Sequence, residues 1–339
     1  MNTVNKKLKT IRAVEPNAGI TSDYAKELRH TVQVLQRAYI QKLTFFIKNN
    51  HSDIANDALL DTMYSGIAGF MAELFVKFYK KTQLIAAKLA AKYGKRAAEA
   101  TGRAQRSAMI KAGIPAGTIS RGFHTPPPPP AVPGRSVGSP EAPGRAVMGL
   151  QSGSDVTLLN LRGGDVTAQQ IVAPPPYDTL RIRAGYVSER AKAALPGMVE
   201  ENTHLITRLC ARSYAAANKA VMTSIEQGLS WDDVEIALHA LPEFDAGRAR
   251  RVAMDQCNKI TQGIHRENAL ALGMNRAVWI HVPGQFESRH SHEDILNGRE
   301  FDTLEGIWDP EVRRYIQPAE LPYCRCISRT VIPEELLND

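Results

Sequence analysis

The sequence predicts a mainly α-helical protein with a smaller α+β C-terminal domain, on three observations. Long stretches in both halves of the chain repeat apolar residues at helical spacing, as in Leu28, Val32 and Leu35. A Pro-rich stretch separates these two helical regions. Beyond Trp279 the pattern changes to short apolar runs divided by turn residues, which is typical of a small β-rich element.

Three helices are expected before the Pro-rich stretch. The first covers 21–49, because apolar residues recur at helical spacing after a Thr-Ser-Asp cap. The second covers 54–93, with a bend near Gly66 and Gly69, and the third covers 96–111.

The region 121–183 is predicted to be a Pro/Gly-rich linker. Five consecutive prolines, Pro126–Pro130, favour extended polyproline geometry, and the segment around them has too few apolar residues to build a core. A semi-rigid spacer is the simpler interpretation, with an SH3-type ligand as the alternative. Three apolar runs further on could form short strands, namely Val156–Leu161, Val166–Val172 and Leu180–Ile182.

Helical patterns return after the linker. We expect a long helix over 198–227, a short helix capped by Ser230, and a third helix over 246–272. The chain therefore divides into a basic helical domain over 1–120, the linker, and an α+β domain over 184–339.

Two turns are expected within the β-rich element. Asn297-Gly298 suits a type I′ hairpin turn, because both central residues of that turn need a positive φ. Asp309-Pro310 begins a second turn. A final strand should follow towards the C-terminus.

Charge is unevenly spread along the chain. Residues 1–120 hold 19 Lys or Arg against 8 Asp or Glu, a net +11, so the remainder carries −4 of the total +7. This asymmetry indicates a polyanion or an acidic protein surface as partner, although a solvated basic bundle explains it equally well. If the partner is double-stranded DNA, binding should be non-specific and salt-sensitive. The candidate contacts recur along one helical region: Lys77, Lys80, Lys81, Lys88, Lys92, Lys95 and Arg96.

Cysteine usage indicates a reducing compartment. The four cysteines suggest no disulfide framework, and Cys210 and Cys257 lie alone within helical patterns, as small core residues do. We expect no signal peptide, because no apolar stretch follows the first lysines. We also expect no membrane span, because charged residues interrupt the most apolar run, Met63–Ala91.

The other two cysteines lie close to a group of histidines. Cys324 and Cys326 could bind zinc together with His290 and His292, because alternate residues of an extended strand share one face. This spacing is unusual for zinc, and the simpler interpretation is a pair of core thiols with Arg325 pointing outwards. We therefore expect no cofactor, with zinc as the alternative.

The same residues permit two kinds of catalysis. Cys324 beside His292 could form a thiolate pair, and His290 with Asn297 suggests an HNH-like nuclease. No oxyanion hole or orienting residue is identifiable, and the order of the nuclease residues does not match. P-loop, dinucleotide-binding and H-E-x-x-H motifs are also missing from the sequence. We therefore expect no catalytic residues.

The C-terminal domain carries a series of landmarks in a fixed order. An Asn-x-x-Leu-Ile element begins at Asn202, and a Gly-x-Ser junction follows within 226–231. The later landmarks are Asp255, Gln256, Trp279, Arg289, His292, Gly298, Phe301, Pro318, Cys324, Arg325 and Cys326. Together they resemble the minor head proteins of tailed phages, the phage Mu F-like or head-morphogenesis family, over about 200–335.

The resemblance implies a structural virion protein without catalysis, which acts in head morphogenesis and is assembled in the host cytoplasm. Its implied partners are the portal protein and the major capsid or scaffold proteins, with packaged double-stranded DNA as a further partner. The landmark residues would then form a portal- or capsid-associated domain.

Two other functions remain open. Domains of this family are sometimes fused to toxin-like effectors, so a nuclease or ADP-ribosyltransferase using the His/Cys cluster is an alternative. The N-terminal half, however, shows neither the paired carboxylates nor the histidine cluster that acid–base chemistry requires. A cellular DNA-binding protein would be expected to carry a helix-turn-helix or zinc-finger module, and neither is recognisable.

Overall fold

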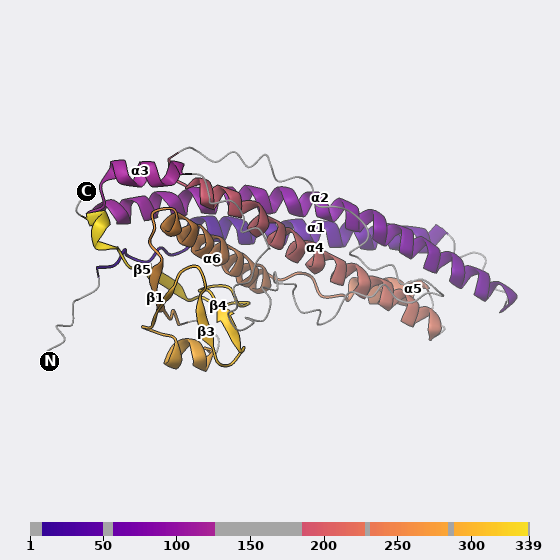
Figure 1. Ribbon diagram of the computed structural model, residues 1–339. Helices are drawn as coiled ribbons and strands as arrows, with labels where there is room; N and C mark the ends of the chain where they lie inside the picture. Colours follow the sequence, from indigo (N-terminus) through magenta and orange to yellow (C-terminus); the bar gives the residue numbers. More distant parts are fainter. Residues whose placement is uncertain (1–8, 50–56, 126–184, 228–230, 284–287, 338–339) are drawn as a thin grey trace, which may run out of the picture.

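The computed structural model describes residues 9–49, 57–125, 185–227, 231–283 and 288–337. Long helices lie side by side, and a small group of short strands sits against one of them, α6 (Figure 1). This architecture confirms the predicted fold class. The strands expected within the linker lie outside the described residues. Among the helices described, none combines the length and apolar character needed to cross a bilayer.

The N-terminal half forms α1 (Ala18–Asn49), α2 (Asp57–Lys111) and α3 (Ala116–His124). We expected 54–93 and 96–111 to be separate helices with a bend near Gly66 and Gly69, and α2 is instead one continuous helix. A helical glycine costs only about 1 kcal/mol relative to alanine. Burial of the apolar face of α2 offsets that cost, so the helix continues through both glycines without a break.

The second half forms α4 (Glu189–Glu226), α5 (Trp231–His239) and α6 (Ala246–Leu270). Helix α4 begins well before the predicted 198 and runs through Pro196, because residues of its first turns, such as Leu195, are fully buried. Helix α6 begins where predicted, and the Asp245 side chain caps it by accepting a hydrogen bond from the Arg248 backbone N–H.

One hydrophobic core joins helices from both sides of the linker. It contains residues of α1, α2, α4, α5 and α6. Buried tyrosines set the register between them. Tyr24 on α1 donates to Asn202 on α4 at 2.7 Å, and Tyr214 on α4 shares a 2.8 Å hydrogen bond with Thr82 on α2. The boundary between 1–120 and 184–339 therefore divides the sequence but not the core.

The C-terminal strands are short and antiparallel. Strand β1 pairs with β2 on one side and β5 on the other, while β3 and β4 form a separate hairpin. A π-helical turn, η3 (Ser291–Ile295), lies between β1 and β2. The strands are β1 (Arg276–Ile280), β2 (Glu300–Asp302), β3 (Ile307–Asp309), β4 (Arg314–Ile316) and β5 (Ile327–Thr330), and the 3₁₀ turn η4 (Glu334–Leu337) follows them.

One of the two predicted turns is present as expected. Asp309-Pro310 begins the turn that joins β3 to β4. The prediction of a type I′ turn at Asn297-Gly298 is wrong. That turn needs a positive φ at both residues, whereas Gly298 has a φ of 79° and the φ of Asn297 is not positive. These two residues follow η3 and bond to β1: Gly298 donates its backbone N–H to the Trp279 carbonyl at 2.8 Å.

The first described residues of the chain pair with residues near its C-terminal end. Residue Thr10 forms a bridge with Val331 beside β5, and Ile11 donates its backbone N–H to the Thr330 carbonyl at 2.9 Å. Gln262 on α6 ties these parts together, since it donates to the Val14 carbonyl and accepts from the Ser328 backbone. The small β-rich region is therefore anchored to α6 and to the N-terminal segment.

Candidate metal centre

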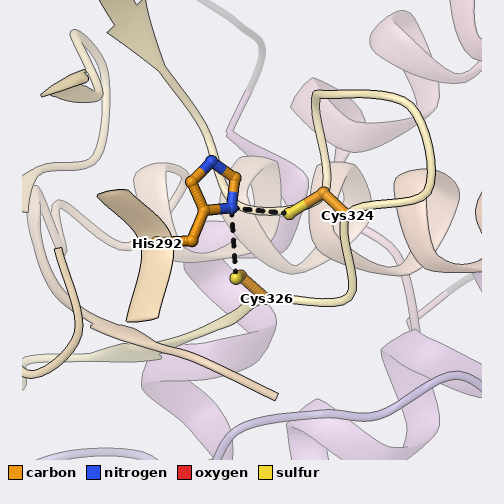
Figure 2. Close-up of side chains that lie close together, drawn as sticks. All are labelled: His292, Cys324 and Cys326. Atoms are coloured by element: carbon orange, nitrogen blue, oxygen red, sulfur yellow. Dashed lines mark hydrogen bonds between the residues drawn. The ribbon is translucent and has the colours of Figure 1, made fainter. Parts of the chain in front are cut away.

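Three buried side chains converge between η3 and the segment that precedes β5. The Nδ1 atom of His292 lies 3.5 Å from the Cys324 sulfur and 3.6 Å from the Cys326 sulfur (Figure 2). Trp279 from β1 packs edge-on against the His292 ring at 5.2 Å. The predicted core thiols are thus buried, and Arg325 between them is exposed, although the segment is irregular rather than a strand.

The histidine beside His292 in the cluster is His281 and not His290. Nδ1 of His281, at the end of β1, lies 3.7 Å from the Cys326 sulfur. His290 is exposed and pairs with Asp294 at 2.6 Å. The prediction that His290 and His292 share one face is wrong, because residues two apart point in different directions on a helical turn.

Each imidazole holds its second nitrogen near an oxygen. The Nε2 atom of His292 lies 3.3 Å from Oδ2 of Asp309, at ion-pair distance but without the alignment of a hydrogen bond. Nε2 of His281 lies 3.3 Å from the Ser288 hydroxyl and 4.0 Å from a carboxylate oxygen of Glu293. Both rings therefore turn Nδ1 towards sulfur and Nε2 towards oxygen.

Asp309 is a fully buried carboxylate at the end of β3. It accepts hydrogen bonds from the Ser291 hydroxyl at 3.2 Å and from the Glu311 backbone N–H at 2.9 Å. A buried charge without such partners would be costly. Its place beside His292 links the β3–β4 hairpin to η3.

The two thiols influence each other's protonation. The pKa of Cys324 lies well below its ordinary value, first because of its hydrogen bond with Cys326 and then, against the opposing effect of burial, because of His292. The pKa of Cys326 is raised by the same bond and by burial. One sulfur of the pair is therefore disposed to be a thiolate, which is the form that binds metals.

Helix α6 holds the cysteine segment in place. Asn258 donates its side-chain N–H to the Cys324 carbonyl at 2.9 Å, and Asp255 accepts the Tyr323 backbone N–H at 2.6 Å. Burial raises the pKa of Asp255 although Lys259 lies nearby and opposes the shift. Gln256 donates to the same carboxylate at 3.0 Å. Two predicted landmarks on α6, Asp255 and Gln256, thus help to hold the cysteine segment in place.

Other predicted landmarks surround the cluster without entering it. Arg289 donates to the Pro322 carbonyl at 3.0 Å, and Phe301 packs 6.2 Å from the Trp279 ring. Pro318 is buried, whereas Gly298 is exposed. The candidate DNA-contact residues lie elsewhere, on α2, so the structure brings the C-terminal landmarks together and leaves these basic residues apart.

Two residues of the site were not among the ligands predicted from the sequence, although His281 belongs to the cluster of His and Arg residues that the sequence shows there. His281 and Asp309 are separated from His292 by loops, and only the pairing of β1 with β2 and the β3–β4 turn brings them close. The signal available in the sequence was the Trp-Ile-His end of an apolar run, which marks His281 as a strand terminus.

The arrangement permits two chemistries. The group of His292, Cys324 and Cys326 offers one nitrogen and two sulfurs within 4.8 Å of one another, which could hold a metal ion. The order Cys324–His292–Asp309 also has the composition of a thiol-nucleophile triad. All three side chains are buried, however, and both sulfurs approach one nitrogen at nearly the same distance, which a single nucleophile does not need.

Comparisons of the chain with protein families, with characterised proteins and with solved structures find no match. The role of the cluster therefore has to be argued from its own geometry.

Proposed function

We propose that the protein is a minor phage head protein that acts structurally in head morphogenesis. The observation that supports this function is that the landmark residues are buried together. Trp279, His292, Phe301, Cys324 and Cys326 form one buried cluster, as a domain-defining motif does. Residues that stabilise a small docking domain in this way suit a protein whose task is assembly.

The partners in this proposal are the portal protein and the major capsid or scaffold proteins. The small domain presents an exposed aromatic pair on the β3–β4 hairpin, where Trp308 and Tyr315 pack edge to face at 5.6 Å. Exposed aromatic side chains are enriched at protein interfaces. They supply a contact surface on the β3–β4 hairpin.

Packaged DNA is the proposed partner of α2. Lys77, Lys80, Lys81 and Lys88 are exposed, and their spacing places them on one face of the helix. Lys92 and Arg96 continue this face, but they are paired with Glu27 and Asp23. The first four lysines are therefore the better candidates for phosphate contacts.

Zinc has a fold-stabilising role in this proposal. The three side chains that could hold the ion are buried, so a metal there would join η3 to the cysteine segment rather than meet a substrate at the surface.

Quantitative mass spectrometry of purified particles tests the proposed function, with portal and capsid proteins as internal standards. We expect a few copies per particle, in constant ratio to the portal. Absence from the particle, together with absence from assembly intermediates, would overturn a head role.

Substitution of His292 and Cys324 separates the structural function from the effector alternative. We expect His292→Ala and Cys324→Ser to reduce assembled heads while purified wild-type protein shows no nuclease or ADP-ribosyltransferase turnover. A turnover that both substitutions abolish would favour the effector instead.

A further inference from the structure

We propose that His281, His292, Cys324 and Cys326 form a closed four-ligand zinc centre, in which Asp309 and Ser288 orient the two imidazoles. This inference rests on the metal-binding part of the proposal above and is independent of any role in a virion. It replaces the predicted ligand His290 with His281.

The spacing of the ligand atoms agrees with a tetrahedral ion. With Zn–S near 2.3 Å and Zn–N near 2.05 Å, a tetrahedral angle places a nitrogen and a sulfur about 3.6 Å apart. Three of the four nitrogen–sulfur pairs of this ligand set lie 3.5, 3.6 and 3.7 Å apart, whereas His281 stands outside the group that His292, Cys324 and Cys326 form within 4.8 Å of one another. A hydrogen bond from the Cys324 thiol to His292 and one from the Cys326 thiol to His281 would explain two of these contacts. The third contact brings the second sulfur to the same His292 nitrogen, which is how the ligands of one ion would be arranged.

The outer contacts of the histidines agree with metal ligation. A metal-binding imidazole usually donates its other N–H to a carboxylate or another oxygen, which fixes the tautomer. Asp309 meets Nε2 of His292, and Ser288 meets Nε2 of His281, so Nδ1 of each ring is left to face the sulfurs. The Nε2 atom of His292 is otherwise a buried polar atom without a hydrogen-bond partner among the described residues.

Charge balance favours two thiolates and two neutral imidazoles. When Zn²⁺ binds, the two thiols release two protons, and the resulting centre is neutral. A neutral centre suits a site in which His292, Cys324 and Cys326 are buried. His281 stands at the rim of this group, with about a tenth of its side chain exposed, and an ion held by the other three ligands draws it in as the fourth.

The centre would join three segments of the small domain. His281 directly follows β1, His292 lies in η3, and the cysteines lie in the segment that Asn258 and Asp255 fasten to α6. Loss of the ion should therefore loosen β1, η3 and the cysteine segment, while the main helical core, a separate cluster of buried residues, keeps its structure.

Metal analysis of the full chain, purified under reducing conditions without an affinity tag that binds metal, tests the ligand set. We expect one zinc per wild-type chain, less than a tenth of that in Cys324→Ser and Cys326→Ser, and one zinc in the matched control His290→Ala. His281→Ala should weaken zinc binding, measured by competition with a chromogenic chelator, by at least the roughly 10–100-fold typical of losing an outer partner.

Cobalt substitution of the wild-type chain keeps the test independent of how the variants fold. Chelator-treated protein given Co²⁺ should show the visible bands of a tetrahedral ion together with thiolate-to-cobalt charge transfer. A wild-type chain that takes up neither zinc nor cobalt would overturn the centre and leave a pair of core thiols. Full zinc affinity in His281→Ala, or loss of zinc in His290→Ala, would overturn the ligand set. Neither result would bear on the particle measurement, so the two proposals can fail separately.

Discussion

Asp309 is the residue whose substitution separates an orienting role from a ligand role. Asp309→Asn keeps one oxygen, which can still accept from the Glu311 backbone N–H, but it replaces Oδ2, the oxygen beside Nε2 of His292 that also accepts from Ser291, and it removes the negative charge. We expect zinc affinity to fall about 10–100-fold while a full equivalent still binds at high zinc concentration. Chelator competition measures this change.

The control for Asp309 is Asp294→Asn. Asp294 is exposed and pairs with His290 outside the cluster, so its removal should leave zinc affinity unchanged. Equal affinities for the two variants would mean that Asp309 does not act on the metal ligand.

His265 makes stability depend on pH. The ring is fully buried on α6, with Nε2 3.0 Å from the Thr330 hydroxyl, and burial lowers its pKa to about 4. The unfolded chain binds a proton near pH 6.5, whereas the folded chain does not until about pH 4, so stability is lost as pH falls through that window. The expected loss is about 2 kcal/mol between pH 8 and pH 5.

Urea unfolding of His265→Gln measures this contribution. The variant should lose that part of the pH dependence, whatever its stability at pH 8. His204→Gln is the control, because His204 is half exposed and its removal should change the pH profile little. Parallel profiles for wild type and His265→Gln would contradict the assignment.

Two glycines of α2 should respond oppositely to alanine. A Cβ at Gly102 would lie 2.2 Å from the backbone carbonyl oxygen of Tyr186, so Gly102→Ala forces α2 away from the segment leading into α4. We expect a loss of about 1–3 kcal/mol. Gly69 has open space around it, and Gly69→Ala should stabilise the same helix by about 0.5–1 kcal/mol. Thermal or urea unfolding checks both signs, and stabilisation by both variants would contradict this packing.

The exposed lysine face of α2 should set the salt dependence of DNA binding. Replacing Lys77, Lys80, Lys81 and Lys88 by Gln should lower the slope of log K against log salt by about 0.9 for each phosphate that the helix no longer neutralises. The control replaces four exposed basic residues on other helices: Lys42, Arg212, Lys219 and Arg250. Fluorescence anisotropy with duplex DNA measures the slopes. Equal slopes for the two variants, or a flat affinity in the wild type, would remove DNA from the partners of α2.

At the scale of the whole molecule, the shared core predicts that the two halves do not fold apart. In a 184–339 fragment the faces of α4 and α6 that contact α1 and α2 would be exposed, including Tyr214 and Ile260. We expect this fragment to be aggregated or molten alone, and soluble when co-expressed with residues 1–125. Size-exclusion chromatography and near-UV circular dichroism check both outcomes. A monomeric, cooperatively folded fragment would contradict the single core.

The sequence by itself determined where most of the helical stretches lie and that the cysteines are buried. Apolar spacing and capping residues are local properties, so 21–49 and the start at Ala246 could be predicted from neighbouring positions alone. The two-residue spacing of Cys324 and Cys326 likewise indicated a shared environment, and both are buried.

Only the tertiary structure decided how these parts meet. The continuity of α2 depends on the helices that cover its apolar face, and the shared core depends on contacts between residues far apart in the chain. The site followed the same rule. His281 replaced His290 because η3 is a helical turn, and Asp309 reached His292 because of a hairpin. A periodic pattern reports which face of an element is buried, but the partner on that face is set by long-range packing, which no local spacing encodes.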